Sequence, residues 1–502
     1  MQGVRQLSLY NEVFDLLVVG GGITGCGVAR DAAMRGLRVA LVERDDFASG
    51  TSGRSSRLVH GGIRYLEHGQ LHLVHESIRE RQTLLRIAPH LVKPLAFTWP
   101  IYEGARVGKL KLRAGLFIYD LMAAGRSRGH FSLDAARTLE REPSLRSEGL
   151  SAGAVYYDAA TDDARLTLAN ALAARQHGAV VVNHATVKSI VRDAADGIRA
   201  TVIGETSSEE LRARVAVNAT GIWQNDFSSD TRGDRLRGSK GTHISVPRER
   251  VGNREALTLI SPVDGRVMFC LPAGAQTIIG TTDTWTTESP EDVRATESDV
   301  RYLLDSANHY FPSARLSASD VVSAWAGIRP LASRAKSANP TSISREHSIA
   351  VDDLGVINVT GGKLTTYRSM AAEVVNTAEK ALGRKPSRAP TDWVLLPGGE
   401  REVGVTKLQN GNPDLAAALI PGLPYTGADL VYAVKEEMAA TLSDALIRRT
   451  HLAFETLDHG VEASARAAEI IAPYLSWSED VKRARLRAYR SDVERMFNIS
   501  PG

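Results

Sequence analysis

Apolar and polar positions near the start of the chain follow the pattern of a strand, a tight turn, a helix and a second strand. A mostly apolar run at 14–19 leads into Gly20-Gly21-Gly22, and a segment with one apolar side follows until Gly36. A second apolar run at 39–42 then ends at an acidic residue. This order of elements predicts a dinucleotide-binding unit, in which the helix N-terminus faces the phosphates.

Four residues of this unit have the properties that a dinucleotide requires. Gly20 allows the tight turn, Gly22 lets the backbone approach a pyrophosphate, and Gly25 lets the helix pack closely on the sheet. Glu43 ends the second strand, where its carboxylate can accept hydrogen bonds from two ribose hydroxyls and would repel a 2′-phosphate. A plain packing turn can also contain three glycines, but it needs neither the flanking strands nor the acid. These residues do not distinguish FAD from NAD.

The rest of the chain alternates helical and extended patterns. Short β-prone runs separated by turn residues at 243–283 and 321–359 predict an antiparallel sheet in a second domain, inserted between parts of the first. Residues 215–221 and 358–368 each run from a strand into a turn of small residues. Other apolar patterns predict helices at 71–87, 164–177, 428–452, 461–471 and 478–496, and strands at 179–183 and 186–191.

Composition narrows the class of protein. The 502 residues are 43% hydrophobic and 24% charged, which is typical of a globular protein of two or three domains. A net charge of +3, with no basic strip interleaved with aromatics, argues against a nucleic-acid partner. Cys26 and Cys270 are too few for a disulfide framework or a metal-ligand cluster, so we expect no metal and a reducing, cytoplasmic setting. The chain has no apolar run of 18 residues and no signal-peptide core. We therefore expect neither a membrane-spanning helix nor a leader.

The segment 106–130 is both basic and amphipathic. Lysines and arginines surround its large apolar residues, and Asp120 is its only acid. Such a segment can lie in the headgroup layer of an anionic membrane with its apolar side buried. A solvated helix that packs on its own domain has the same pattern, so both interpretations stay open at this point.

A series of motifs resembles one enzyme family. The chain contains, in this order, GGGITGCG, SSRLVHGGIRYLEHG, VNATGIW, KGTHISVP, IIGTTD, GIRPL and GGKLTTYR. These motifs resemble those of the FAD-dependent sn-glycerol-3-phosphate dehydrogenases of the bacterial aerobic type, which belong to the D-amino-acid-oxidase-like flavoproteins. The resemblance covers the whole chain, including DALIRRTHL in the helical C-terminal part.

The resemblance implies an α/β fold with an α+β insertion. A glutathione-reductase-like FAD-binding domain is expected at 1–90, 150–235 and 355–385, and a substrate domain with an antiparallel sheet at 91–149 and 236–354. Residues 386–502 are expected to form a helical C-terminal domain.

The same resemblance implies the chemistry and the setting. The cofactor is FAD, the substrate sn-glycerol 3-phosphate, the product dihydroxyacetone phosphate and the electron acceptor a quinone. The protein is expected to attach peripherally to the inner face of the cell membrane through 106–130, and we consider a homodimer as its assembly.

Two histidines compete for the role of general base. His60 lies in a loop rich in Ser and Gly, and imidazole is suited to proton transfer near neutral pH. The related glycerophosphate oxidases imply the catalytic role for it, although a histidine that only hydrogen-bonds its own loop would look the same. His243 in KGTHISVP is the competitor; we expect it near the substrate, with a structural role at the start of a strand.

A phosphorylated substrate requires cations, and arginine binds phosphate oxygens with two hydrogen bonds at once. The family places Arg329 at the reacting end of the site, and we assign it to the substrate C2 oxygen. We assign Arg64, beside Tyr65, and Arg345, in SISREH, to the phosphate. Tyr65 and Lys363 are further candidates for the substrate site.

Other residues are candidates for cofactor contacts. The turn at 361–365 is expected to open a helix whose positive N-terminus faces the flavin C2 carbonyl and N1, where it would stabilise the charge of the reduced ring. The further candidates are Thr51, Ser52, Ser55, Ser56, Val187, Gly221, Gly362, Lys363, Leu364 and Thr365.

Three alternative functions remain at this stage. An oxidase would use the same substrate and pass electrons to oxygen. An amine oxidase on a related fold would pair a substrate carboxylate rather than a phosphate. A non-enzymatic escort protein for small GTPases would keep the dinucleotide fold for binding alone and would need no base beside a flavin.

Overall fold

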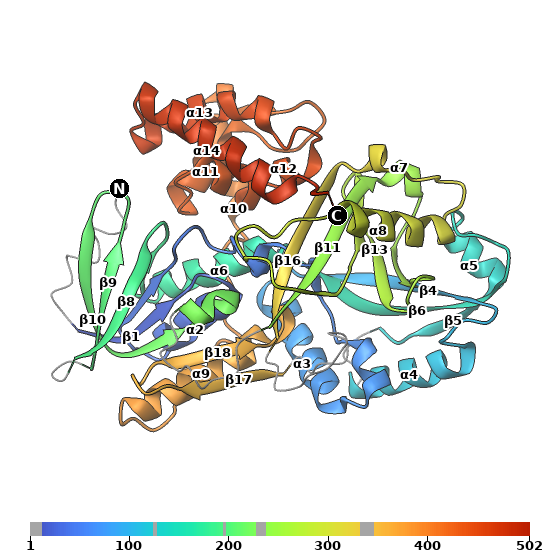
Figure 1. The fold of residues 1–502 in the computed structure, drawn as a ribbon, viewed down its shortest axis with the longest axis horizontal. Helices are drawn as coiled ribbons and strands as arrows, with labels where there is room; N and C mark the ends of the chain where they lie inside the picture. Colours follow the sequence, from blue (N-terminus) through green and yellow to red (C-terminus); the bar gives the residue numbers. More distant parts are fainter. Residues whose placement is uncertain (1–12, 124–127, 194–196, 227–236, 332–345, 502) are drawn as a thin grey trace.

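The structure is a computed structural model, and it describes residues 13–123, 128–193, 197–226, 237–331 and 346–501. Two mixed sheets lie beside each other, and a group of C-terminal helices lies above them (Figure 1). The fold is therefore α/β with a helical C-terminal region, as predicted from the sequence.

The first sheet contains both runs of the predicted dinucleotide unit. Its strands run in the order β17-β18-β10-β1-β2-β7, with β9 paired to β10 and β8 paired to β9. The parallel strands are β1 (Phe14–Val19), β2 (Val39–Val42), β7 (Val180–Val182), β10 (Ser208–Asn218) and β18 (Ile357–Gly361). The antiparallel additions are β8 (Thr186–Asp193), β9 (Gly197–Ile203) and β17 (His347–Val351).

Three helices pack against this first sheet. They are α2 (Ile23–Met34), α6 (Asp163–Gln176) and α9 (Tyr367–Ala381), and α2 contacts both of the others. Small residues such as Ala29 and Ala32 let α2 lie close to its neighbours in the core beneath the parallel strands. Strand β1 is buried on both faces, which explains its continuous apolar run.

The second sheet is antiparallel except where β4 runs parallel to β12. Its order is β15-β11-β14-β13-β12-β4-β6-β3, with β16 paired to β11 and β5 paired to β6. The strands are β3 (Leu58–Val59), β4 (Lys93–Tyr102), β5 (Phe131–Asp134), β6 (Leu150–Ala160), β11 (Arg237–Pro247), β12 (Ala256–Ile260), β13 (Val267–Ala273), β14 (Gln276–Gly280), β15 (Thr284–Thr286) and β16 (Ser323–Leu331). The antiparallel sheet predicted for 243–283 and 321–359 is confirmed for β11, β13, β14 and β16.

The sheets divide the chain differently from the predicted boundaries in three places. Strand β3 lies within the expected first domain, but it pairs with β6 in the second sheet. Strand β6 begins at Leu150, where the first domain was expected to resume, but it pairs with β4 in the second sheet. Strand β17 lies before residue 355, within the expected substrate domain, but it pairs with β18 in the first sheet. The sheet that a strand joins depends on its hydrogen-bonded partners after folding, which local apolar patterns do not show.

In the described part of the chain, five further helices lie beside the second sheet. They are α3 (Leu71–Ile87), α4 (Lys109–Met122), α5 (Ala135–Arg141), α7 (Arg248–Val251) and α8 (Glu297–Tyr310). The bounds of α3 agree with the helix predicted at 71–87. The helix predicted at 164–177 is observed as α6, and the Asp162 side chain caps it by accepting a hydrogen bond from the backbone N–H of Arg165.

The C-terminal region is helical, with one correction. It contains α10 (Arg401–Gly411), α11 (Gly427–Glu436), α12 (Leu452–Glu455), α13 (Val461–Leu475) and α14 (Glu479–Phe497). The single helix predicted at 428–452 is interrupted, because α11 ends at Glu436 and a π-helical turn forms at Asp444–Arg449. The Asp444 carboxylate accepts hydrogen bonds from the backbone N–H groups of Ala440 and Thr441, which fixes the break.

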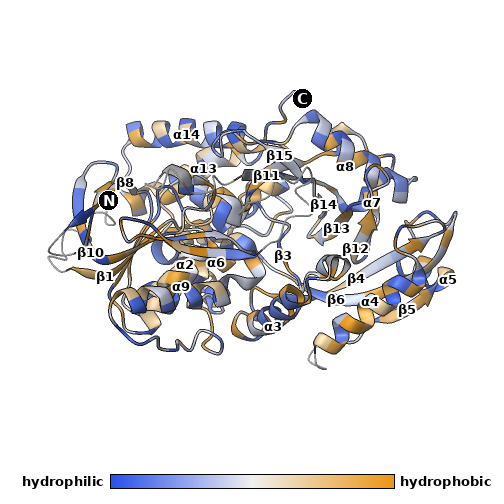
Figure 2. Ribbon diagram, turned by 60° about the horizontal axis from the view of Figure 1, so that its bottom comes forward, coloured by the Kyte–Doolittle hydropathy of each residue, from blue (hydrophilic) through white to orange (hydrophobic). Residues whose placement is uncertain are grey.

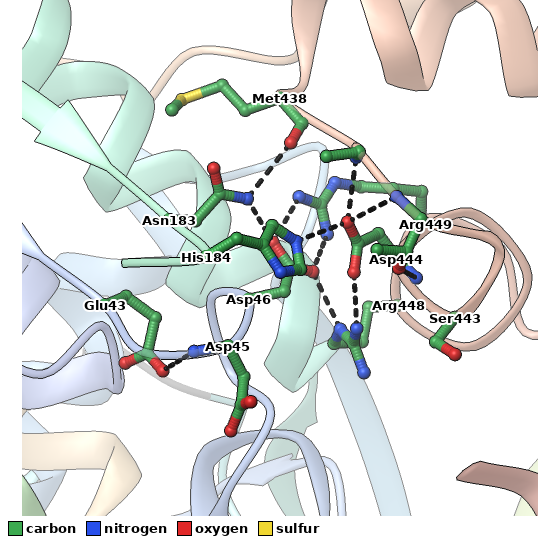
Figure 3. A network of polar contacts seen from close by, with 12 residues as sticks. Glu43, Asp45, Asp46, Asn183, His184, Met438, Ser443, Asp444, Arg448 and Arg449 are labelled. Carbon is green, nitrogen blue, oxygen red and sulfur yellow. Dashed lines mark hydrogen bonds and ion pairs between the residues drawn. The ribbon is translucent and has the colours of Figure 1, made fainter. Parts of the chain in front are cut away.

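A buried network of charges joins this C-terminal region to the loop after β2 (Figure 3). The Asp46 carboxylate accepts two hydrogen bonds from Arg449, at 2.7 and 2.9 Å, and one from Arg448 at 2.7 Å. Arg448 and His184 both contact Asp444, at 2.6 and 2.8 Å. Asp46, Asp444 and Arg449 are fully buried, so each charge depends on its partners for stabilisation.

In the described part of the predicted amphipathic segment 106–130, the helix α4 spans Lys109–Met122. Hydrophobic and hydrophilic stretches alternate along α4 in Figure 2. Leu112, Leu116 and Tyr119 point into the core, whereas other apolar side chains are exposed: Leu110 at 83%, Phe117 at 63% and Leu121 at 69%. Among the described residues, no helix combines the length and the hydropathy that crossing a bilayer would need.

Candidate active site

A cavity of about 610 Å³ lies between the two sheets and brings distant segments together. Its wall contains the first glycine turn, the loop at 49–65, parts of β11 and β16, and the second glycine turn at 361–365. This volume is within the range of cavities that hold cofactors and substrates.

The first glycine turn has the geometry expected from the sequence. Gly20 has a φ of +105°, and a Cβ atom on Gly25 would lie 1.9 Å from the carbonyl oxygen of Gly20. Gly22 is the N-cap of α2 and offers no side-chain cap, while Ser52 Oγ accepts from the backbone N–H of Ile23 at 2.9 Å. The helix N-terminus therefore faces the cavity with donor groups and its positive dipole end.

Glu43 lies at the edge of this turn, with its carboxylate held by the backbone. One oxygen accepts from the N–H of Gly21 at 2.5 Å, and the other accepts from the N–H of Asp45 at 2.8 Å. Burial raises the pKa of Glu43 to about 7, although these two hydrogen bonds oppose the shift. Each oxygen keeps a lone pair for a further donor in the cavity.

The predicted hydroxyl groups of the 49–60 loop line the cavity, but most are already bonded to protein. Thr51 donates to the carbonyl of Ile328 at 2.6 Å, and Ser55 donates to Asp163 at 2.6 Å. Ser56 contacts His243 at 2.8 Å. These contacts fix the loop against β16, α6 and β11, so its shape does not depend on a ligand.

The two candidate bases lie in different surroundings. His60 lines the cavity, and its backbone N–H donates to the Thr365 hydroxyl at 3.2 Å. His243 is fully buried on β11 and stacks on Trp325 with ring centroids 5.4 Å apart. Burial, aided by the charges of Arg329 and Arg57, lowers the pKa of His243 to about 3. So weak a base does not suit proton abstraction at neutral pH.

Arg329 extends from β16 across β11 into the cavity. Its guanidinium donates to the Asp283 carboxylate at 3.1 Å and to the Thr281 hydroxyl at 3.0 Å. A Cβ atom on Gly241 would lie 2.2 Å from Nη2 of Arg329, so only glycine at this position leaves room for the group. Asp283 is the last residue of the motif IIGTTD, but it was not among the predicted site residues.

The second glycine turn presents Lys363 to the cavity. The Lys363 ammonium donates to Ser77 Oγ at 3.1 Å and lies 4.1 Å from the centre of the Tyr65 ring. The expected helix does not start at 361–365: a 3-10 turn forms at Leu364–Thr366, and α9 follows from Tyr367. Gly362 has a φ of +83°, which keeps the turn close to the sheet.

The remaining candidates fall into three groups. Val187 and Gly221 line the cavity together with Leu364. Arg64 lies in a 3-10 turn at Ile63–His68, but its side chain is outside the described part of the structure. Arg345 also lies outside the described residues.

Comparison with known proteins identifies the family. A family model described as FAD dependent oxidoreductase matches residues 15–368, and one described as the C-terminal domain of alpha-glycerophosphate oxidase matches residues 399–482. Glycerol-3-phosphate dehydrogenase 2 of Mycobacterium tuberculosis is 36% identical, over 97% of this chain and 89% of the relative. The chain belongs to the FAD-dependent glycerol-3-phosphate dehydrogenase family.

Further members and neighbours agree with this family. The mitochondrial glycerol-3-phosphate dehydrogenase of Rattus norvegicus is 36% identical over 94% of this chain and 72% of its own. The glycerol-3-phosphate dehydrogenase of Bacillus halodurans, solved in complex with FAD, superposes with a TM-score of 0.79 at 30% identity, covering 97% of this chain and 96% of that chain. L-alpha-glycerophosphate oxidase of Mycoplasma pneumoniae shares the fold at 20% identity, with a TM-score of 0.59 over 77% of this chain and 100% of that chain.

FAD is the cofactor of this family, and the cavity fits it. The N-terminus of α2, where the N-cap residue Gly22 has no side chain, offers donors for a pyrophosphate, and Glu43 offers acceptors for ribose hydroxyls. Gly221 has open space where a Cβ atom would stand, so backbone and cofactor can approach each other there.

One group of residues has the composition of a metal site. Asp46, His184 and Asp444 offer three ligand atoms within 4.8 Å of one another. Both carboxylates, however, already pair with Arg448, and Asp46 also pairs with Arg449 (Figure 3). A metal cation would be repelled by these two guanidinium groups, so the contacts favour a structural ion-pair network.

Proposed function

We propose that this protein oxidises sn-glycerol 3-phosphate to dihydroxyacetone phosphate, with FAD as hydride acceptor and a membrane quinone as the final acceptor. The observation that supports it is a single cavity that contains a histidine, an arginine and a lysine beside two glycine turns suited to a dinucleotide. Oxidation of a secondary alcohol needs a base for the hydroxyl proton, and a phosphorylated substrate needs cations.

His60 is the proposed general base. It takes the proton from the C2 hydroxyl, while FAD, when bound, accepts the hydride at its N5. His243 is a poor alternative, because its Nε2 contacts Ser56 and its pKa is lowered to about 3 by burial. We assign it to holding the 55–60 loop on β11.

Arg329 is proposed to hold the C2 oxygen as charge develops on it. Its bonds to Asp283 and Thr281 fix the direction of the guanidinium before substrate binds. We assign Lys363 and Tyr65 to the substrate as well, and Arg64 and Arg345 to its phosphate group, because a phosphate needs cations that bind its oxygens.

Cofactor contacts are proposed for the residues of both glycine turns. Gly20, Gly22, Gly25 and Ser52 would hold the pyrophosphate, and Glu43 the adenosine ribose. The other proposed contacts are Thr51, Ser55, Ser56, Val187, Gly221, Gly362, Lys363, Leu364 and Thr365.

The outer face of α4 is proposed to attach the protein to the inner face of the cell membrane. Leu110, Phe117 and Leu121 are exposed along one side of the helix, next to the exposed cations Lys111 and Arg113. Burying these apolar groups in a headgroup layer, with the cations at anionic lipids, would be favourable. This position would bring the reduced protein to the quinone pool.

We propose the three domains expected from the family, with β3 and β6 moved to the substrate domain and β17 moved to the FAD domain by their sheet pairing. The first sheet with α2, α6 and α9 would be the glutathione-reductase-like FAD domain, the second sheet the substrate domain, and residues 386–502 the C-terminal domain. Oxygen is the second candidate acceptor, because the C-terminal family match is described by the name of an oxidase.

Anaerobic reduction of the purified holoenzyme tests the proposal. Addition of sn-glycerol 3-phosphate is expected to bleach the oxidised flavin spectrum, and unphosphorylated glycerol at the same concentration is expected to leave it unchanged. A flavin that stays oxidised with the phosphorylated substrate would contradict the function. Afterwards, re-oxidation by a soluble quinone and by oxygen, with hydrogen peroxide measured, distinguishes dehydrogenase from oxidase.

A further inference from the structure

Three donors converge on one oxygen of a buried carboxylate beside the cavity. Asp158, near the end of β6, accepts with its Oδ1 from the backbone N–H of Gly61 at 2.9 Å and from the Tyr119 hydroxyl at 2.6 Å. Arg81 donates to the same oxygen and forms an ion pair with it. Asp158, Arg81 and Tyr119 are buried, so this cluster is stabilised by its own contacts.

The cluster ties together elements that are far apart in the sequence. Arg81 comes from α3, Tyr119 from the inner face of α4, and Asp158 from the second sheet. Arg81 also donates to the Tyr119 hydroxyl at 3.0 Å and to the carbonyl of Tyr157 at 2.8 Å. Burial raises the pKa of Tyr119 well above its usual value, so this hydroxyl keeps the proton that it donates.

Close packing, as well as its hydrogen bond, fixes the position of Gly61. A Cβ atom at this position would lie 2.1 Å from the Tyr119 hydroxyl and 2.7 Å from Ile78. The preceding N–H, that of His60, donates to the Thr365 hydroxyl at 3.2 Å. Two consecutive peptide groups are therefore fixed, one by the second glycine turn and one by Asp158.

We infer that Asp158, Tyr119 and Arg81 are positioning residues that set the direction of the His60 side chain in the cavity. This inference rests on the proposed role of His60 as the base. Asp158 is the acceptor that holds the turn, Arg81 pairs with Asp158 and fixes its position, and Tyr119 fills the space above Gly61 and orients the carboxylate. Because proton transfer depends steeply on distance and angle, a small displacement of this turn slows the reaction without removing any group that contacts the substrate.

Tyr119→Phe is the variant that tests the inference, because it removes one hydroxyl and keeps the ring. Tyr310→Phe is the matched control: its hydroxyl is also buried on a helix and donates to a backbone carbonyl, that of Ile260, at 2.6 Å, away from the cavity. Both variants are first checked for full FAD content and unchanged thermal unfolding. We expect Tyr119→Phe to slow flavin reduction about tenfold, with little change in the substrate concentration that gives half the maximal rate.

A double-mutant cycle with His60→Asn shows whether Tyr119 acts through the histidine. We expect Tyr119→Phe to cause no further loss in the His60→Asn background, and to shift the acid limb of the pH–rate profile only when His60 is present. Equal losses in both backgrounds, or a rate for Tyr119→Phe equal to that of Tyr310→Phe, would overturn the inference. An unchanged rate in His60→Asn alone would instead show that His60 is not the base. That result would contradict the proposed function, and it can be distinguished from a failure of the inference about Tyr119.

Discussion

The guanidinium of Arg329 lies against the backbone of Gly241, on the neighbouring strand of the second sheet. A Cβ atom at Gly241 would meet Nη2, Cζ and Nη1 of Arg329 at 2.2, 2.5 and 2.6 Å. The missing side chain on β11 thus provides the space through which Arg329 reaches Asp283 and Thr281. A glycine in a strand interior commonly marks such a close approach.

Gly241→Ala is expected to displace the Arg329 guanidinium and leave the fold intact, because the clash is with the flexible end of a side chain. Loss of the Arg329 contact to the substrate C2 oxygen should lower kcat/KM for sn-glycerol 3-phosphate about tenfold, equivalent to about 1.4 kcal/mol. Steady-state kinetics measures this, with Gly115→Ala as control, since a Cβ atom at Gly115 meets nothing within 4 Å. An unchanged kcat/KM would contradict the proposed contact between Arg329 and the substrate.

Gly25→Ala is expected to affect the fold itself. The new Cβ atom would lie 1.9 Å from the backbone oxygen of Gly20, which cannot rotate away. Forcing α2 from the first strand should cost about 1–3 kcal/mol of unfolding free energy and reduce FAD content. Denaturant unfolding measures this free energy. The control Gly115→Ala should instead stabilise the protein by about 0.5–1 kcal/mol, because alanine is more favourable than glycine within a helix. Equal stability of the two variants would contradict the close packing.

The affinity for FAD should depend on pH through Glu43. Burial raises the pKa of this side chain to about 7, so below pH 7 the cofactor-free protein carries a proton there. Ribose hydroxyls donate to the ionised form, and binding must then release that proton. The affinity is expected to rise from pH 6 to pH 8 by up to about tenfold and to level off above pH 8.

Fluorescence titration of apo-protein with FAD at constant ionic strength measures this dependence. Glu43→Gln should bind more weakly and show no slope over the same range, because glutamine does not titrate. A slope of the same size in Glu43→Gln would assign the effect to another group.

Asp46 is expected to be essential for docking of the C-terminal helices. Asp46→Asn leaves Arg449, which is fully buried, without its carboxylate partner, and breaking such a pair costs about 3–5 kcal/mol. Thermal unfolding should show a large drop, whereas Asp480→Asn, which breaks an exposed pair with Arg483, should have almost no effect. Similar stabilities would mean that the network contributes little.

The α4 face should determine membrane binding. Replacing Leu110, Phe117 and Leu121 by Ser is expected to reduce cosedimentation with anionic vesicles at least tenfold, because the apolar area that enters the bilayer is lost. Flavin reduction in solution should be unaffected, since these side chains are exposed. The triple variant Lys109→Gln, Lys111→Gln and Arg113→Gln should bind more weakly mainly at low salt. Undiminished binding by both variants would leave α4 as a solvated surface.

Local features of the site were predictable because neighbours in the chain create them. The first glycine turn, the α6 cap and the bounds of α3 each follow from residues within one turn or strand. The break in the helix predicted at 428–452 does not follow from the apolar spacing, because polar contacts hold it: Asp444 accepts from the backbone N–H groups of Ala440 and Thr441 and pairs with His184, in the turn between β7 and β8. The spacing of apolar residues along the chain does not indicate such polar contacts.

The sequence by itself determined that the chain contains a dinucleotide turn, an antiparallel second sheet, a helical C-terminal part and the motifs of a flavoprotein family. Only the tertiary structure decided that Asp283 holds Arg329, that Asp158 holds the turn at Gly61, and that His243 is buried as a weak base. The physical reason is that backbone conformation depends on adjacent residues, whereas burial and charge pairing depend on segments that meet only after folding.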